Sequence, residues 1–225
     1  MQQLLLDIAP PASPTLANFL PGRNVELWEL LRRLAANQEP ERFIYIWGDP
    51  GCGKSHLLQA MTRETSQKGL STVYFSCKTN GDFVVNETIN GVTVDDVDLL
   101  DMPSQIKLFN LYNQIRDESN AFLIVSGQLA PAQLNLRQDL VTRLGWGLVY
   151  RVHELMDEEK IRAMKHHATH CGFDLPQEVC DYLLRHERRD LLSLIGTIDA
   201  LGRYSLANKR QITVPLLREL LQGAS

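Results

Sequence analysis

Apolar residues follow two alternating spacings along this chain, and the alternation predicts helices interleaved with strands. Residues 25–36 repeat leucine at helical intervals, which predicts an amphipathic helix. Residues 43–47 form a short, almost wholly apolar run of the kind found in strands buried on both faces. The two patterns recur downstream. Further strands are expected at 71–76, 92–97, 121–126 and 147–152, with helices from a glycine-rich turn to Gly69 and at 104–118.

After Val152 the strand patterns stop and only helical ones remain. Helices are expected at 157–171, 175–186, 190–207 and 215–221, with Asp157 capping the first. Strands that alternate with helices predict an α/β fold, in which a parallel sheet is covered by helices on both faces. The sequence therefore predicts an α/β unit followed by a small all-helical unit.

The first 21 residues differ from the rest of the chain. Met1 to Ile8 is mostly apolar, and Pro10, Pro11, Pro14 and Pro21 follow. Proline at this density ends a helix and favours extended backbone. We expect a short exposed tail and then an extended linker.

Composition and charge exclude several classes of protein. The 225 residues include 44% hydrophobic and 22% charged residues, as in a globular domain. The net charge of −4 argues against a chain that coats nucleic acid, so any DNA contact is expected to be indirect or weak. The longest uncharged stretch, 119–136, is interrupted by polar residues, which argues against a membrane span. Four cysteines without C-x-x-C spacing and no export signal favour a reduced cytoplasmic protein.

A complete phosphate-binding pattern, G-x-x-x-x-G-K-[ST], lies between the first predicted strand and the next predicted helix. Glycines allow consecutive backbone N–H groups to face a phosphate, the lysine reaches its outer oxygens, and the hydroxyl binds Mg²⁺. His56, which follows, is expected to pack in the helix beside the nucleotide. The nucleotide-binding residues are Gly48, Asp49, Pro50, Gly51, Cys52, Gly53, Lys54, Ser55 and His56.

Two acids end the strand predicted at 92–97. Asp95 is the expected Mg²⁺ ligand together with Ser55. Asp96 is the expected catalytic carboxylate, which orients or deprotonates an attacking water. Asp98 is interpreted as an exposed turn residue.

Three histidines, His166, His167 and His170, share one charged helical segment with Cys171 nearby. No carboxylate stands at a clear ligand spacing. They are therefore interpreted as solvated helix residues and not as a metal site.

Together with the phosphate-binding loop and the VDD motif at 94–96, the segments AFLIVSGQ (121–128) and TRLGWG (142–147) resemble the ATPase core of DnaA-type AAA+ initiators. The resemblance covers about residues 13 to 222. It implies an AAA+ P-loop core at 13–152 and a helical lid at 153–225, with ADP or ATP and Mg²⁺ as cofactors. It also implies that Phe19 and Leu20 contact the adenine base, and that Arg143 is an arginine finger offered to a neighbouring subunit.

The helix-turn-helix domain that initiators carry after the lid is absent from these 225 residues, so the closest resemblance is to the Hda family, short homologues that inactivate DnaA. That family has an N-terminal clamp-binding peptide. Here residues 1–12 offer Gln3, Leu4, Leu6 and Ile8, and Gln2 provides a second register. The resemblance implies a DnaA-type initiator and the DNA polymerase sliding clamp as partners, with no membrane contact and a possible homo-oligomer.

The chain departs from the initiator pattern at two sensor positions. Gln128 stands where an acid is common, and Leu192 stands where the family has its lid arginine. Arg188 or Arg189 could replace that arginine, and Arg189 is the candidate sensor. Both departures remove charge near the γ-phosphate, which predicts weak intrinsic hydrolysis.

Two functions follow from these expectations. In the first, the nucleotide-bound chain docks on the clamp and stimulates ATP hydrolysis by the DnaA initiator, which inactivates it. In the second, the chain is an autonomous small AAA+ ATPase or a helicase-loader-like protein. The N-terminal peptide and Leu192 favour the first, and the intact loop with Asp95 and Asp96 favours the second.

Overall fold

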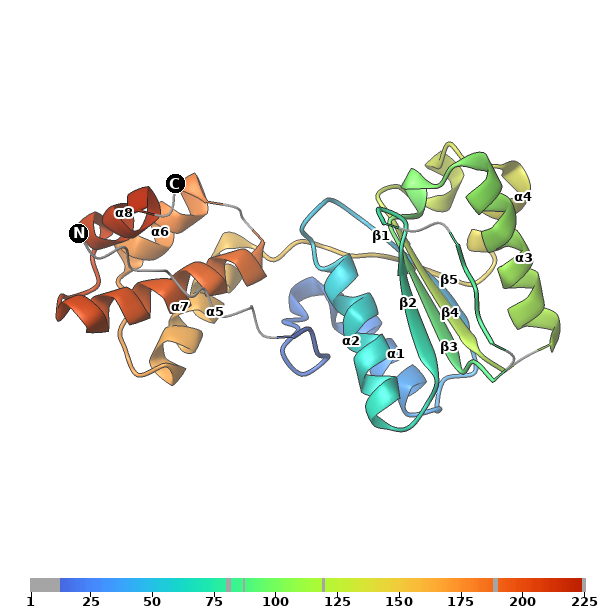
Figure 1. The fold of residues 1–225 in the computed structure, drawn as a ribbon, viewed down its shortest axis with the longest axis horizontal. Coiled ribbons are helices and arrows are strands. Elements are labelled where there is room, and N and C mark those ends of the chain that lie inside the picture. The colour runs from blue at the N-terminus through green and yellow to red at the C-terminus, as the bar shows by residue number, and fades with distance from the viewer. Residues whose placement is uncertain (1–12, 80–81, 87, 119, 188–189, 224–225) are drawn as a thin grey trace. The chain divides into compact units, whose positions relative to one another are not determined.

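The computed structural model describes residues 13–79, 82–86, 88–118, 120–187 and 190–223. The chain divides into two compact units, one spanning Pro14–Glu154 and the other lying within Leu155–Ser225 (Figure 1). Each unit has a hydrophobic core of its own.

The first unit is built on a five-stranded sheet. Its strands are β1 (Phe43–Trp47), β2 (Thr72–Ser76), β3 (Gly91–Asp95), β4 (Phe122–Gly127) and β5 (Leu148–Arg151). They lie in the order β2-β3-β4-β1-β5, and every neighbouring pair is parallel. The predicted parallel sheet is therefore confirmed.

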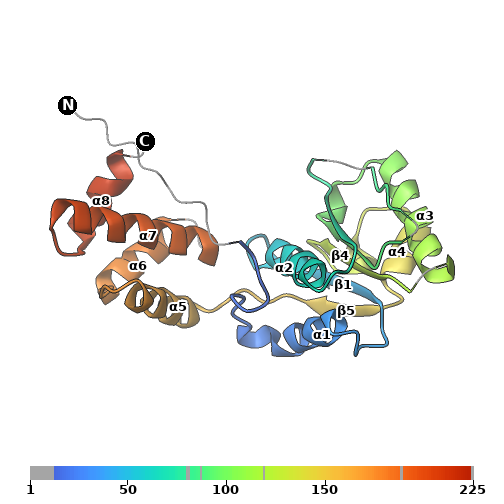
Figure 2. The same ribbon diagram turned by 60° about the horizontal axis from the view of Figure 1, so that its bottom comes forward.

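Helices cover both faces of this sheet. They are α1 (Val25–Ala35), α2 (Lys54–Gln67), α3 (Met102–Glu118) and α4 (Gln138–Leu144). Figures 1 and 2 show α1 and α2 on one face and α3 and α4 on the other. Because side chains alternate along a strand, Ile44 and Ile46 of β1 enter the core under α1 and α2, while Tyr45 enters the core under α3 and α4.

One detail of the first unit differs from the prediction. Strand β3 ends at Asp95 and not at Val97, because Asp96 adopts a left-handed conformation (φ 59°) that turns the chain into a 3-10 helix, Val97–Leu99. The buried face of α3 is formed by Leu108, Leu111, Tyr112 and Ile115.

The second unit contains α5 (Asp157–His170), α6 (Gln177–His186), α7 (Leu191–Asn208) and α8 (Val214–Gly223). Asp157 is not the cap of α5 as predicted. The capping position is Met156, whose backbone N–H donates to the Glu159 carboxylate at 2.8 Å. None of the described helices is long and apolar enough to cross a bilayer.

Candidate nucleotide-binding site

Three neighbouring strands deliver the predicted site residues of the first unit to one edge of the sheet. The phosphate-binding loop follows β1, Asp95 and Asp96 lie at the end of β3, and Gln128 follows β4. β4 lies between β1 and β3. The connection from β1 runs past β4 to β2, and the connection from the adjacent β4 runs the other way, past β1 to β5. Open α/β sheets bind ligands outside the carboxyl ends of their strands at such a reversal of strand order.

The loop from Gly48 to Gly53 has, at its three glycines, a backbone conformation that only glycine adopts without strain. The φ angles of Gly48, Gly51 and Gly53 are 152°, 84° and 106°. A Cβ on Gly48 would lie 2.4 Å from the carbonyl oxygen of Val152, immediately after β5. The loop is therefore held against the end of β5, and its curvature depends on these glycines.

Lys54 begins α2 and folds back over the loop. Its Nζ donates to the carbonyl oxygens of Gly48 at 2.7 Å and Asp49 at 3.0 Å, and the residue is only 7% exposed. An ammonium held here, beside the N-terminus of α2, is suited to a phosphate oxygen. Ser55 is exposed, and within the described residues its hydroxyl makes no hydrogen bond. Burial raises the pKa of the Cys52 thiol, as befits a small buried residue of the loop and not a nucleophile.

Asp95 is buried and held by two hydroxyl groups. The Tyr74 hydroxyl donates to one carboxylate oxygen at 2.8 Å, and the Ser126 hydroxyl donates to the other. Burial, together with the carboxylate of Asp95, raises the pKa of Tyr74 to about 12. The Ser55 hydroxyl and the Asp95 carboxylate are both hard oxygen donors, so this donor set fits Mg²⁺.

Asp96 is connected to the same hydroxyl. Its backbone N–H donates to Ser126 Oγ at 3.1 Å, and its carboxylate pairs with Lys78 Nζ at 2.7 Å. Burial and then the charges of Asp96, Asp95 and Asp98 raise the pKa of the nearby Cys77 thiol to about 12. The end of β3 is thus a region of concentrated negative charge that a cation can neutralise.

Gln128 directly follows β4, and Asp98 fixes its backbone. The Gln128 N–H donates to Asp98 Oδ2 at 2.8 Å, while Asp98 Oδ1 is buried without a hydrogen-bond partner in the described part of the chain. Asp98 is therefore not the solvated turn residue that was predicted. Instead its carboxylate fixes the backbone at the sensor position by accepting this hydrogen bond.

The segment before α1 packs against the loop. The Phe19 ring is buried, and a Cβ on Gly53 would lie 2.9 Å from it. His56 Nε2 lies 3.0 Å from the carbonyl oxygen of Thr15, and burial lowers the pKa of this imidazole. Leu20 is 40% exposed. Phe19 and His56 thus lie beside the loop, as a role in nucleotide binding requires.

Arg143 lies on α4 among aromatic rings. Its guanidinium carbon is 4.1 Å from the Trp146 ring centroid and 5.8 Å from those of Phe109 and Tyr112. Its Nη1 is buried and has no hydrogen-bond partner in the described residues. Trp146 is 60% exposed. An arginine stacked on an exposed tryptophan, with donors unused, is typical of a protein–protein surface.

Comparison with protein families assigns the helical unit. Residues 157–221 match the family model described as Hda, lid domain. In this unit the chain is Hda-like. Residues 28–89 also match the model described as Nephrocystin 3, N-terminal, a segment that spans β1, the phosphate-binding loop and β2.

Solved structures place the Hda-like chain among DnaA-type AAA+ folds. A crystal structure of a DNA replication initiation factor is 25% identical, with a TM-score of 0.69 over 87% of this chain and 67% of that chain. Domain III of Thermotoga maritima DnaA is 22% identical, with a TM-score of 0.76 over 95% of this chain and 98% of that chain. AMPPCP-bound DnaA from Aquifex aeolicus is 24% identical, with a TM-score of 0.70 over 88% and 69%. The predicted AAA+ core with a helical lid is confirmed.

Two groups of predicted residues of the Hda-like chain lie outside the described residues. These are the clamp-binding peptide and the candidate lid sensor, and both stay predictions. The residues concerned are Gln3, Leu4, Leu6 and Ile8 in the first group and Arg189 in the second.

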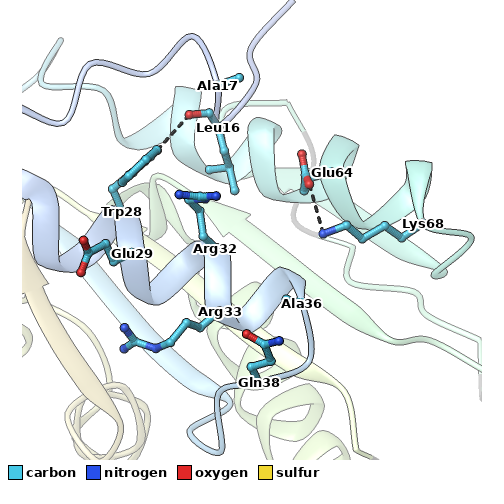
Figure 3. Close-up of a pocket in the computed structure, with 10 residues that line it drawn as sticks. All are labelled: Leu16, Ala17, Trp28, Glu29, Arg32, Arg33, Ala36, Gln38, Glu64 and Lys68. Carbon is cyan, nitrogen blue, oxygen red and sulfur yellow. Dashed lines mark hydrogen bonds and ion pairs between the residues drawn. The ribbon is translucent and has the colours of Figure 1, made fainter.

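A groove of 710 Å³ in the first unit is lined by none of the residues predicted to bind the nucleotide. Figure 3 shows it between α1, α2 and the segment at Leu16, where Trp28 Nε1 donates to the Leu16 carbonyl oxygen at 2.9 Å. Its charged lining alternates in sign, with Glu64 paired to Lys68 at 3.1 Å. It therefore offers a phosphate no uniform positive charge.

Ser126, which was not predicted as a site residue, is fully buried and links Asp95 to the Asp96 backbone. A usable signal existed, because Ser126 is the one hydroxyl in the apolar run AFLIV-S and sits where that run ends. A buried hydroxyl needs a partner, and the neighbouring strand supplies it.

Proposed function

We propose that this DnaA-related replication regulator binds ADP or ATP with Mg²⁺ at the loop 48–55, docks on the sliding clamp, and stimulates ATP hydrolysis by a DnaA-type initiator. The observation that carries the proposal is the lid match joined to the loop geometry, in which Lys54, Ser55 and Asp95 offer one ammonium and two oxygen donors. Phe19 and Leu20 would contact the base. The nucleotide would replace the carbonyl partners of Lys54 with phosphate oxygens, which bear more negative charge.

In this proposal, Arg143 is the residue that acts on the nucleotide of the partner. An acid from its own chain would compete with the partner's phosphate, and none is paired with Arg143 among the described residues. Cation–π stacking on a partly exposed ring is worth only about 1 kcal/mol, so an incoming γ-phosphate can draw the guanidinium away from Trp146. A guanidinium supplied in this way stabilises charge on the transferring phosphoryl group.

A neighbouring apolar surface supports partner binding on the same helix. Trp146, Val141 and Leu134 line a depression of 300 Å³ beside α4. The exposed Trp146 at this depression and Arg143, which is stacked on it, are of the residue types that dominate binding energy at protein interfaces. The initiator is the partner we assign to it, since the chain is DnaA-related.

The autonomous ATPase is the second candidate, and the intact loop with Asp95 and Asp96 favours it. Asp96 is the group that would orient water, but its carboxylate is paired with Lys78. Gln128 adds no charge at the sensor position. We therefore expect slow turnover by the chain alone and faster hydrolysis only on the initiator.

Calorimetry tests the nucleotide-binding part of the proposal. Lys54→Ala is expected to weaken ADP and ATP binding at least about a hundredfold, because a charge-assisted contact to phosphate is lost. Lys68→Ala is the matched control: it removes a lysine from just beyond the other end of α2 and should bind as the parent does. Absence of nucleotide binding to the folded parent chain would contradict the proposal.

The action on the initiator is tested by following the conversion of initiator-bound ATP to ADP. The chain and DNA-loaded clamp together should accelerate it, and omission of either should remove the effect. Basal ATPase activity of the chain alone that equals the stimulated rate would favour the autonomous enzyme instead.

A further inference from the structure

Three potential metal ligands from two helices of the second unit converge on one point. His167 lies in the last turn of α5, and Cys171 stands at its C-terminal cap, four residues later. Asp199 comes from α7. His167 Nε2 is 2.6 Å from Asp199 Oδ1, Cys171 Sγ is 3.5 Å from His167 Nε2, and Cys171 Sγ is 3.8 Å from Asp199 Oδ1.

The arrangement is not that of a nucleophilic relay. In a thiol–imidazole–carboxylate relay the nucleophile and the acid contact opposite nitrogens of the ring, so that a proton can pass between them. Here the thiol and the carboxylate both approach the same nitrogen, Nε2. One nitrogen, one sulfur and one oxygen that face a common point are instead a donor set of the kind that binds a metal ion.

We propose that His167, Cys171 and Asp199 form a binding site for Zn²⁺ that joins α5 to α7. A tetrahedral zinc ion with bonds of about 2.0–2.3 Å sets its ligand atoms roughly 3.3–3.8 Å apart. The two distances that involve Cys171 Sγ already match this spacing. The His167–Asp199 contact has to open by about 0.7 Å to reach it.

The chemistry of the donors and their setting agree with this ion. Thiolate, imidazole and carboxylate are the three ligand types that zinc accepts in proteins. The carbonyl groups at the C-terminal end of α5 favour a cation there. The backbone is firmly supported, because Met164 and Ala168 of α5 and Ile198 of α7 are buried in the same core. Three protein ligands at a partly exposed position leave the fourth to water.

This inference is independent of the proposed nucleotide site, and zinc itself is the probe. The reduced full-length chain, free of nucleotide and Mg²⁺, is titrated with Zn²⁺ by calorimetry. We expect one zinc ion per chain with micromolar or tighter affinity. Co²⁺ in place of zinc should give a thiolate charge-transfer band together with the intense visible bands of a four-coordinate site.

Single substitutions identify the ligands. His167→Gln, Cys171→Ser and Asp199→Asn are each expected to lower zinc affinity at least tenfold, and Cys171→Ser should abolish the charge-transfer band. His186→Gln, which alters a histidine of the second unit that packs against the Tyr182 ring, is the control and should bind zinc as the parent does. Circular dichroism without metal establishes that each variant is folded.

Three outcomes would overturn the proposal. One is a folded parent that binds no zinc at a single saturable site. Another is a parental zinc affinity in Asp199→Asn, which would leave only His167 and Cys171, both from the end of α5, as ligands. The third is an equal loss in His186→Gln, which would mean that zinc binds lid histidines without selection.

Discussion

Gly127, at the end of β4, is a position where a single added methyl group should lower stability measurably. A Cβ there would lie 2.0 Å from the Tyr45 hydroxyl oxygen and 3.3 Å from Asp98 Oδ2. That hydroxyl is itself engaged, because it donates to the Leu129 carbonyl oxygen at 2.8 Å. The Gly127→Ala methyl group must therefore displace a buried hydrogen bond as well as push a ring aside.

The two costs can be estimated separately. Overpacking a buried site costs about 1–3 kcal/mol, and the hydrogen bond is worth about 0.5–1.5 kcal/mol. Gly127→Ala should therefore lower the free energy of unfolding by about 1.5–4.5 kcal/mol. Tyr45→Phe alone should cost about 1 kcal/mol, because only the hydrogen bond is lost.

The double variant separates this explanation from a general loss of glycine flexibility. Without the hydroxyl, the nearest ring atom to the new methyl group is Cζ at 3.1 Å, which a small shift accommodates. The loss in free energy of unfolding in the Gly127→Ala, Tyr45→Phe double variant should therefore be smaller than the sum of the two single losses by at least about 1 kcal/mol.

Urea denaturation followed by tryptophan fluorescence measures these differences. All three tryptophans of the chain, Trp28, Trp47 and Trp146, lie in the Pro14–Glu154 unit, so the signal reports that unit. Additive effects in the double variant would refute the reasoning, as would a Gly127→Ala protein of parental stability.

Two remaining predictions concern the tail and the acids of β3. Replacing Gln3, Leu4 and Leu6 together by alanine should abolish clamp binding in a pull-down and leave the melting temperature unchanged; clamp binding as strong as the parent's would place the contact elsewhere. The Tyr74 hydroxyl, which donates to Asp95, has its pKa raised to about 12 from 10.0. Its stabilising effect should be complete below pH 10 and lost as the pH rises toward about 12, because the unfolded tyrosine ionises first. The stability difference between the parent and Tyr74→Phe should therefore shrink over this range in urea titrations, and a constant difference would contradict the assignment.

Local patterns were sufficient to predict the elements of the α/β unit. The leucine spacing of α1 and the apolar run of β1 each specify an element, because each is complete within a few residues. The phosphate-binding loop is equally local, since Gly48, Gly51 and Gly53 all adopt the positive φ that the motif requires.

Contacts between distant residues could not be predicted in this way. Asp199 lies 28 residues beyond Cys171, and only the packing of α5 on α7 brings the two together. Likewise, Ser126 of β4 contacts Asp95 of the adjacent strand β3, and Asp98 accepts a hydrogen bond from the Gln128 backbone. The left-handed conformation of Asp96 was not predicted, because the apolar Val97 beyond it suggested that the strand continued.

The effect of Arg143→Ala on hydrolysis by the initiator tests the central claim most directly. The measurement is the rate at which initiator-bound ATP becomes ADP with DNA-loaded clamp present. Arginine fingers are worth roughly 10³–10⁵ in rate in GTPase systems, and we expect a loss of at least about tenfold here because the initiator supplies part of its own machinery.

The controls isolate the guanidinium. Arg137→Ala removes an arginine that is paired with Asp139 at the start of the same helix, and it should stimulate as the parent does. Lysine at position 143 should restore little, since a point charge lacks the planar fork. The account predicts an Arg143→Ala protein that retains its nucleotide and its clamp binding but no longer stimulates the initiator. Stimulation at the parental rate by Arg143→Ala would contradict it.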